Sequence, residues 1–146
     1  MNNERSNNGM LTAALVLAVI GAAFSMIGGI GCLAGFNWVN DFGNAVGVGN
    51  VIPVEVWIWG IGATIGGVIA IVGAALVKKG GLIAPILLLV AAAIGIASIW
   101  IVNFMGLIGG ALILISAILA FVARGQKTRD VDHNNSFNDN NFNGNI

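Results

Sequence analysis

Charged residues are scarce in this sequence. Of its 146 residues, six are Lys or Arg and six are Asp or Glu, so that 8% of the chain is charged. A soluble domain usually carries about 25%. The net charge is zero, so no overall positive field of the kind that draws a protein to nucleic acid is present. Hydrophobic residues make up 58% of the chain. The composition therefore indicates that lipid, rather than water, is its main solvent.

Cysteine and histidine are rarer still. Because Cys32 is the single cysteine, an intrachain disulfide is excluded. We interpret Cys32 as a small packing residue near the outer end of the first apolar segment, with an intermolecular disulfide as the alternative. The single histidine, His133, follows Asp130 and Asp132. One histidine beside two aspartates is weak support for metal binding, so we predict no metal-ligating and no cofactor-binding residues.

What the sequence does contain is four apolar segments, over about residues 10–34, 55–77, 82–102 and 104–123, with no Lys, Arg, Asp or Glu in their interiors. Each has roughly the 20 residues that a helix needs to cross about 30 Å of hydrocarbon. In lipid the backbone must satisfy its own hydrogen bonds, so helices are expected rather than strands. The sequence predicts an all-α membrane protein, a compact bundle of four transmembrane helices that follows a short N-terminal segment (residues 1–9).

The few charges predict how the chain is threaded. Lys78 and Lys79 lie in a four-residue turn between the second and third segments. With four spans, this turn and both termini fall on one side, together with all six basic residues, and the positive-inside rule identifies that side as the cytoplasm. We expect the two lysines to anchor the topology, with weak attraction to anionic lipid. The prediction is a multi-pass protein of the cell membrane with cytoplasmic termini.

The opposite side is expected to carry a loop over residues 35–54, which has no basic residue. Tryptophans, which prefer the headgroup layer, mark the same interface. They are Trp38, Trp57, Trp59 and Trp100.

Small residues recur with helical periodicity in every segment. At about 100° per residue they share one face of each predicted helix, and larger aliphatic residues occupy the other faces. The small-residue faces comprise Ala14, Ala18, Gly21, Ser25, Gly28 and Cys32 in the first segment, Gly62, Gly66, Ala70 and Gly73 in the second, Ala84, Ala91, Gly95 and Ser98 in the third, and Gly106, Gly110 and Ala117 in the fourth. Since helices in lipid associate by close packing over small residues, these faces predict a compact bundle.

Side chains that could carry chemistry are few. Glu55 is the one acid that a transporter could use, but it lies at the outer boundary and we interpret it as an interfacial residue. Asp41 could bind a cation weakly with Asn37, Asn40 and Asn44, although turn formation explains the asparagines better. The polar residues inside the segments are expected to bond between helices; they are Thr12, Ser25, Thr64, Ser98 and Ser116. We find no catalytic residues and predict that the protein is not an enzyme.

The C-terminal segment, residues 124–146, is rich in asparagine. It lacks the apolar residues of a core, so we predict a disordered cytoplasmic tail. Phe137 and Phe142 are either anchors for a partner or part of a tail without a binding role.

Two stretches resemble each other: "IGGVIAIVGAAL" (residues 65–76) and "IGGALILISAIL" (residues 108–119). Both would run from outside to inside. Either a two-helix hairpin was duplicated, or biased composition produced the match.

The stretch "GIGATIGGVIAIVGAALVKKGGLIAPILLLVAAAIGIASIWIV", followed by "GGALILISAILAFVARGQK", resembles a family of small four-span membrane proteins of Gram-positive bacteria and some archaea, known only as a domain of unknown function. The resemblance covers about residues 11–127 and implies no catalytic residues. The Asn-rich tail departs from the family's short ending.

The leading functional interpretation is a non-enzymatic structural or interaction component of the cell envelope. Its partners would be the lipid bilayer, and a second copy or other membrane proteins bound through the small-residue faces, but not nucleic acid. The alternative is a small oligomeric transporter or pore-forming subunit.

Overall fold

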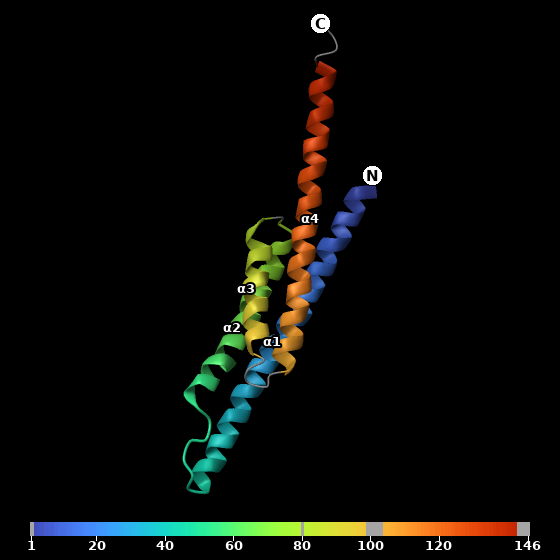
Figure 1. The fold of residues 1–146 in the computed structure, drawn as a ribbon. Helices are drawn as coiled ribbons and strands as arrows, with labels where there is room; N and C mark the ends of the chain where they lie inside the picture. The colour runs from blue at the N-terminus through green and yellow to red at the C-terminus, as the bar shows by residue number, and fades with distance from the viewer. Residues whose placement is uncertain (1, 80, 99–103, 143–146) are drawn as a thin grey trace.

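The computed structural model describes the backbone of residues 2–79, 81–98 and 104–142, and the side chains from Asn7 to Gln126 within those ranges. It contains four helices, α1 (Asn2–Ala45), α2 (Val54–Val77), α3 (Ile83–Ala97) and α4 (Phe104–Phe142), and no strand in these ranges (Figure 1). The predicted all-α bundle of four helices is confirmed.

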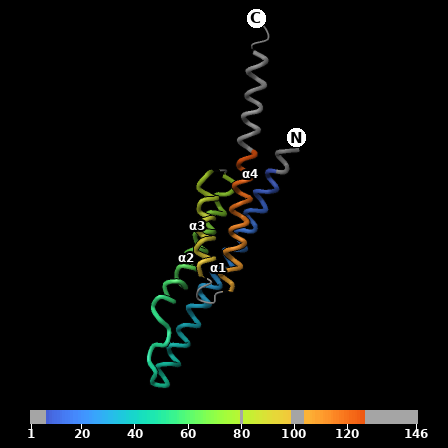
Figure 2. Tube along the Cα trace, viewed as in Figure 1, coloured from blue at the N-terminus to red at the C-terminus, as the bar shows by residue number. Residues whose placement is uncertain are grey.

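The contacts between the helices form a closed ring. Each helix runs antiparallel to its two neighbours (Figures 1 and 2). α1 packs against α2 and α4, and α3 packs against the same two helices. Across the ring, α2 and α4 make only marginal contact. Every helix therefore buries two adjoining strips of its surface, one against each neighbour.

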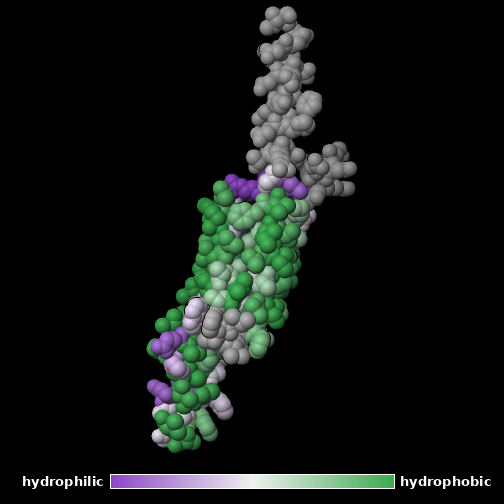
Figure 3. Space-filling model, in the orientation of Figure 1, coloured by the Kyte–Doolittle hydropathy of each residue, from purple (hydrophilic) through white to green (hydrophobic). Residues whose placement is uncertain are grey.

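The interior of the ring is built mainly from alanine, glycine and serine. Leu88 and Ile113 are its largest fully buried side chains. Large aliphatic side chains such as Val16, Ile27 and Ile118 are exposed instead. On the face shown in Figure 3, hydrophobic side chains cover the flank of the bundle, with hydrophilic side chains next to them near both ends. This distribution suits a bundle whose outer surface meets lipid tails.

Three of the helices, α1, α2 and α4, are long and apolar enough to cross a membrane, as expected of a membrane protein. α3 has 15 residues, and its length of about 22 Å is less than the hydrocarbon core. Residues 99–102, which the sequence prediction placed in the third span, lie outside the described part of the chain.

The predicted outer loop is much shorter than expected. α1 continues to Ala45, so only residues 46–53 connect it to α2. The prediction of a loop from residue 35 was wrong because glycine and asparagine suggested a turn, whereas packing against α2 stabilises the helix. Phe36 of α1 meets Trp57 of α2 edge to face, with ring centroids 5.9 Å apart.

α4 also extends beyond its predicted boundary. The bundle itself ends close to Ala123, as the sequence indicated, but the helix continues to Phe142. The backbone of residues 124–142 is thus helical where the composition predicted disorder. Side chains after Gln126 are outside the described set.

The two hairpins, α1–α2 and α3–α4, repeat the same contacts. Gly67 of α2 packs against α1, its partner in the first hairpin, and Gly110 of α4 packs against α3, its partner in the second. The glycine that precedes each of these two packs against the other hairpin. Gly66 of α2 contacts α3, and Gly109 of α4 contacts α1. An approximate two-fold axis along the bundle would exchange these contacts. The internal sequence repeat therefore corresponds to a structural repeat.

Candidate functional site

Neighbouring helices of the bundle meet with their backbones in direct contact. A Cβ atom added to Gly95 would lie 2.9 Å from the Gly110 Cα atom, and one added to Gly21 would lie 2.8 Å from the Gly109 carbonyl oxygen. Contacts this short exclude any larger side chain and leave no room for water between these helix pairs. With the fully buried side chains of Leu88 and Ile113, these contacts form a tightly packed core at this level.

The small-residue faces predicted from sequence occupy this interior. All the predicted residues are buried except Cys32 and Gly62, which are half-buried. Gly62 has no neighbouring atom within 4 Å of a Cβ position, so the Gly62–Gly66 pair is not a contact motif. The prediction missed Gly67 and Gly109, because it assumed one small face per helix whereas each helix meets two neighbours.

Two buried serines join helices by hydrogen bonds, as the sequence predicted. Ser25 donates to the Ala63 carbonyl oxygen across the α1–α2 contact (3.0 Å), and Ser116 donates to the Ala14 carbonyl oxygen across the α1–α4 contact (2.5 Å). The other predicted donors differ, because each bonds within its own helix. Those residues are Thr12, Thr64 and Ser98.

The connection between α1 and α2 is held by asparagine. The Asn40 side-chain oxygen accepts hydrogen bonds from the backbone N–H groups of Val51 and Ile52, both at 2.9 Å. Gly47 and Gly49 adopt positive φ angles of 78° and 80°, which allow the chain to turn. Asn40 therefore stabilises the turn between α1 and α2, which is the role that the sequence favoured.

A cation site near Asp41 is not assembled. The Asn37 amide donates to the Leu33 carbonyl oxygen of its own helix, and Asn44 lies 3.5 Å from the Asn50 side-chain oxygen. Asp41 is exposed. Among the residues that the structure describes, no group of three or more His, Cys, Asp or Glu side chains could hold a metal ion.

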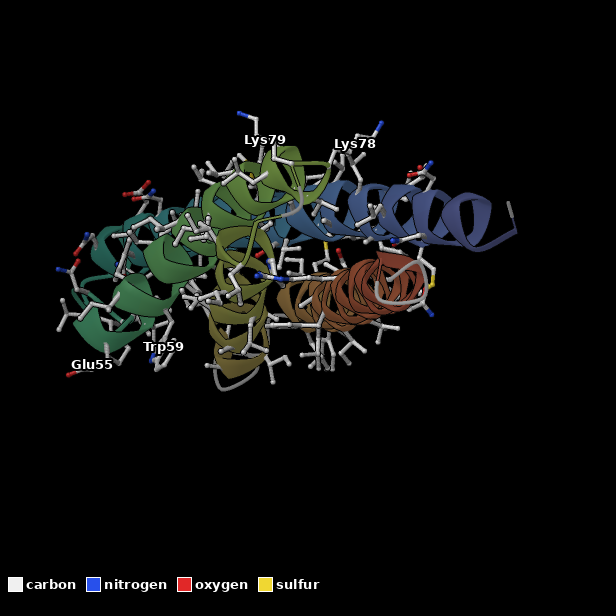
Figure 4. The ribbon with its side chains drawn as sticks, turned by 90° about the horizontal axis from the view of Figure 1, so that it is seen from above. Glu55, Trp59, Lys78 and Lys79 are labelled. Carbon is white, nitrogen blue, oxygen red and sulfur yellow. The ribbon has the colours of Figure 1, made fainter. Side chains whose placement is uncertain are left out.

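The outer part of the α1–α2 hairpin extends past the ends of α3 and α4 (Figure 1). Aromatic side chains are exposed on this outer hairpin, which we define as residues 35–59. Trp38 is 70% exposed and stacks on Phe42, with centroids 6.1 Å apart. Glu55 and Trp59 point away from the bundle (Figure 4). Three tryptophans thus lie at this end as predicted, while Trp100 is outside the described residues.

The opposite end holds a cavity of about 60 Å³ between all four helices. Its polar lining comes from Asn7, Lys78 and Arg124. The apolar lining residues are Leu11, Val77, Ala84, Pro85, Ala120 and Ala123, with Gly81 in the turn. The Lys78 and Lys79 side chains are exposed and project outward from the bundle (Figure 4). The sequence predicted that the lysines lie at this end. It did not predict the cavity, because the cavity forms only where the ends of four helices meet.

The remaining candidates stay predictions. Cys32 is a free, half-buried cysteine, which suits its assignment as a packing residue. The side chains of His133, Phe137 and Phe142 lie beyond those the structure describes.

Comparisons with protein-family models, with curated proteins and with solved structures give no match for this chain. The resemblance to the four-span family of unknown function therefore stays a prediction, and the function has to be argued from the site itself.

Proposed function

We propose that this chain is a four-span protein of the cell membrane that has no enzymatic activity and acts by binding other components of the cell envelope. Both termini and the Lys78–Lys79 turn would lie in the cytoplasm. The outer hairpin would face the other side. The charge asymmetry of the sequence and the apolar flank of the bundle support this arrangement.

One observation carries the proposal, namely the close packing of small residues between neighbouring helices. Gly21 against Gly109 and Gly95 against Gly110 bring three helices together without space between them. The buried serines nearby use their hydroxyl groups to bond backbone carbonyls. A transporter that works as a single copy would need a path lined by polar side chains through this interior. The alternative, a pore-forming subunit, would need a path between several copies.

The outer hairpin is the surface best suited to bind a protein partner. The small-residue faces, where the sequence placed such contacts, are occupied within the bundle. In contrast, Trp38 and Phe42 are exposed beyond α3 and α4. Exposed aromatic clusters are typical of protein interfaces, where they supply much of the binding energy.

Two measurements test the proposal. Vesicles reconstituted with the purified protein should show no ion or proton flux above that of empty vesicles. A protein-selective photocrosslinker at Trp38 should capture one discrete protein in intact membranes, whereas the same crosslinker at Val19, on the exposed flank, should capture none. Flux that is lost in a folded Glu55→Gln variant would instead establish the transporter alternative.

A further inference from the structure

The cavity at the lysine end lies where the apolar helices give way to polar residues. Val77 lines it and is followed by Lys78, and Ala123 lines it and is followed by Arg124. On α1 the change occurs between Asn7 and Leu11. Three helices thus change from polar to apolar at the level of the cavity. In a membrane this level corresponds to the boundary between hydrocarbon and headgroups.

The charge around the cavity is entirely positive among the side chains that the structure describes. Lys78, Lys79 and Arg124 are the three cations in that set, and all three lie at this end. The two described acids, Asp41 and Glu55, lie at the opposite end of the bundle in the outer hairpin. Among the described side chains, this distribution favours an anion at the lysine end over the outer end.

The cavity also presents hydrogen-bonding groups. Arg124 contributes a guanidinium, which can bind two phosphate oxygens in parallel. The Asn7 side-chain oxygen is buried and has no hydrogen-bond partner among the described atoms. Because the two ends of an amide exchange by rotation, Asn7 can turn its NH₂ group toward an anion.

The start of α3 adds to this setting. The helix begins beside the cavity, with Gly81 and Ala84 in the lining, and its N-cap residue Leu82 provides no side-chain hydrogen bond. Its first N–H groups and the positive end of its dipole therefore favour negative charge nearby.

We propose that this cavity binds the phosphate group of an anionic phospholipid from the leaflet that surrounds it. The volume, about 60 Å³, exceeds the roughly 10–15 Å³ that a cavity needs to hold one water molecule and is far below the 300 Å³ or more of a pocket for a drug-sized ligand. It suits a small headgroup whose acyl chains remain in the bilayer. Basic pockets between membrane helices on the cytoplasmic side commonly take such headgroups. The inference does not depend on the proposed protein partner.

The test uses the full chain purified in an uncharged detergent. Phosphatidylglycerol is expected to raise the midpoint of thermal unfolding in a saturable way. Phosphatidylcholine with the same acyl chains should leave the midpoint unchanged. Inorganic phosphate at equal concentration should also leave it unchanged. Equal stabilisation by phosphatidylcholine would overturn the proposal, and equal stabilisation by inorganic phosphate would overturn the lipid as the source of the anion.

Matched variants separate this site from general attraction between basic residues and lipid. Arg124→Gln should weaken phosphatidylglycerol binding about tenfold, the effect of losing a charge-assisted pair of hydrogen bonds. Lys79→Gln removes the same charge at the same end but outside the cavity lining, and should change binding less than twofold. Equal weakening by both variants would show diffuse attraction and contradict the site.

If Arg124→Gln does not fold, a second variant can still test whether the lipid binds in the cavity. Gly81→Leu adds bulk at the cavity with no change of charge, and its Cβ would meet nothing closer than the Ile83 nitrogen at 4.0 Å. It should weaken lipid binding while preserving the unfolding midpoint without lipid. Unchanged binding in a folded Gly81→Leu protein would exclude the cavity as the binding site.

Discussion

The two hairpins of this protein are alike at the centre of the bundle and different at its outer end. Gly67 and Gly110 make equivalent close contacts, each with the other helix of its own hairpin. Yet α1 has 44 residues and α3 has 15, and at the outer end only the first hairpin extends past the bundle. The central part and the outer part of the molecule therefore differ in role. The repeated central part holds the fold together, and the additional length of the first hairpin carries exposed aromatic side chains that the bundle does not need.

The largest expected effect comes from breaking the repeated contact itself. Gly110→Leu would place a Cβ atom 2.8 Å from the Ile96 nitrogen, and Gly67→Leu would place one 3.1 Å from the Ala22 carbonyl oxygen. Backbone atoms cannot move aside, so we expect each variant to lose about 3 kcal/mol or more of stability. Thermal unfolding in detergent measures this loss.

Gly31→Leu is the control for these two variants, since no atom lies within 4 Å of its Cβ position. It should unfold like the original protein. If one hairpin tolerated the leucine and the other did not, the two glycine contacts would not be equivalent.

The serine hydrogen bonds should have a smaller effect. Ser25→Ala and Ser116→Ala each remove one bond between helices, and in membrane proteins such bonds contribute about 0.6 kcal/mol on average and up to about 1.7. Ser98→Ala is the matched control because Ser98, the C-cap residue of α3, bonds to the Gly95 carbonyl oxygen of that same helix. Unfolding midpoints should fall for the first two variants and stay nearly constant for the third. A larger loss for Ser98→Ala than for Ser116→Ala would contradict this ranking.

The turn of the first hairpin should respond locally. Asn40→Ala removes the acceptor for the Val51 and Ile52 amides, at a cost of about 1 kcal/mol. Hydrogen exchange at these two amides should accelerate, while exchange in the bundle stays unchanged. Asn40→Asp keeps an acceptor oxygen and should preserve protection. Equal acceleration in both variants would show that the side-chain oxygen is not what protects the amides.

The smallest effect on stability is expected at Trp38. Because this side chain is 70% exposed, Trp38→Ala should change the free energy of unfolding by less than about 0.5 kcal/mol. Binding of an envelope partner should nevertheless be lost, as measured by crosslinking from Phe42. A large loss of stability would mean that the outer hairpin is part of the fold rather than a binding surface.

The sequence predicted the bundle and its small interior because both follow from helical periodicity. Residues such as Ala14, Ala18 and Ser25 recur on one face whatever the neighbouring helices are. Periodicity does not say how many neighbours a helix has, so the second face, with Gly67 and Gly109, was missed. Local composition also misjudged where α1 ends, because packing of Phe36 on Trp57 outweighs the low helix propensity of glycine and asparagine.

The candidate sites depend on contacts between distant segments, so the sequence indicated them only in part. The lysine turn could be read directly from Lys78 and Lys79. The cavity beside it requires Asn7 of α1 and Arg124 of α4 to meet the start of α3. No local pattern in the sequence encodes that meeting.

The most direct test of the account asks whether both hairpins cross the membrane in the same direction. Single cysteines are placed at Asn44, Lys79, Phe104 and Gln126 in a Cys32→Ser background and labelled with a membrane-impermeant thiol reagent in intact cells. We expect labelling of Asn44→Cys and Phe104→Cys from outside, and labelling of Lys79→Cys and Gln126→Cys only after permeabilisation. Phe104→Cys that labels only after permeabilisation would show that the second hairpin does not span the membrane and would contradict the four-span bundle.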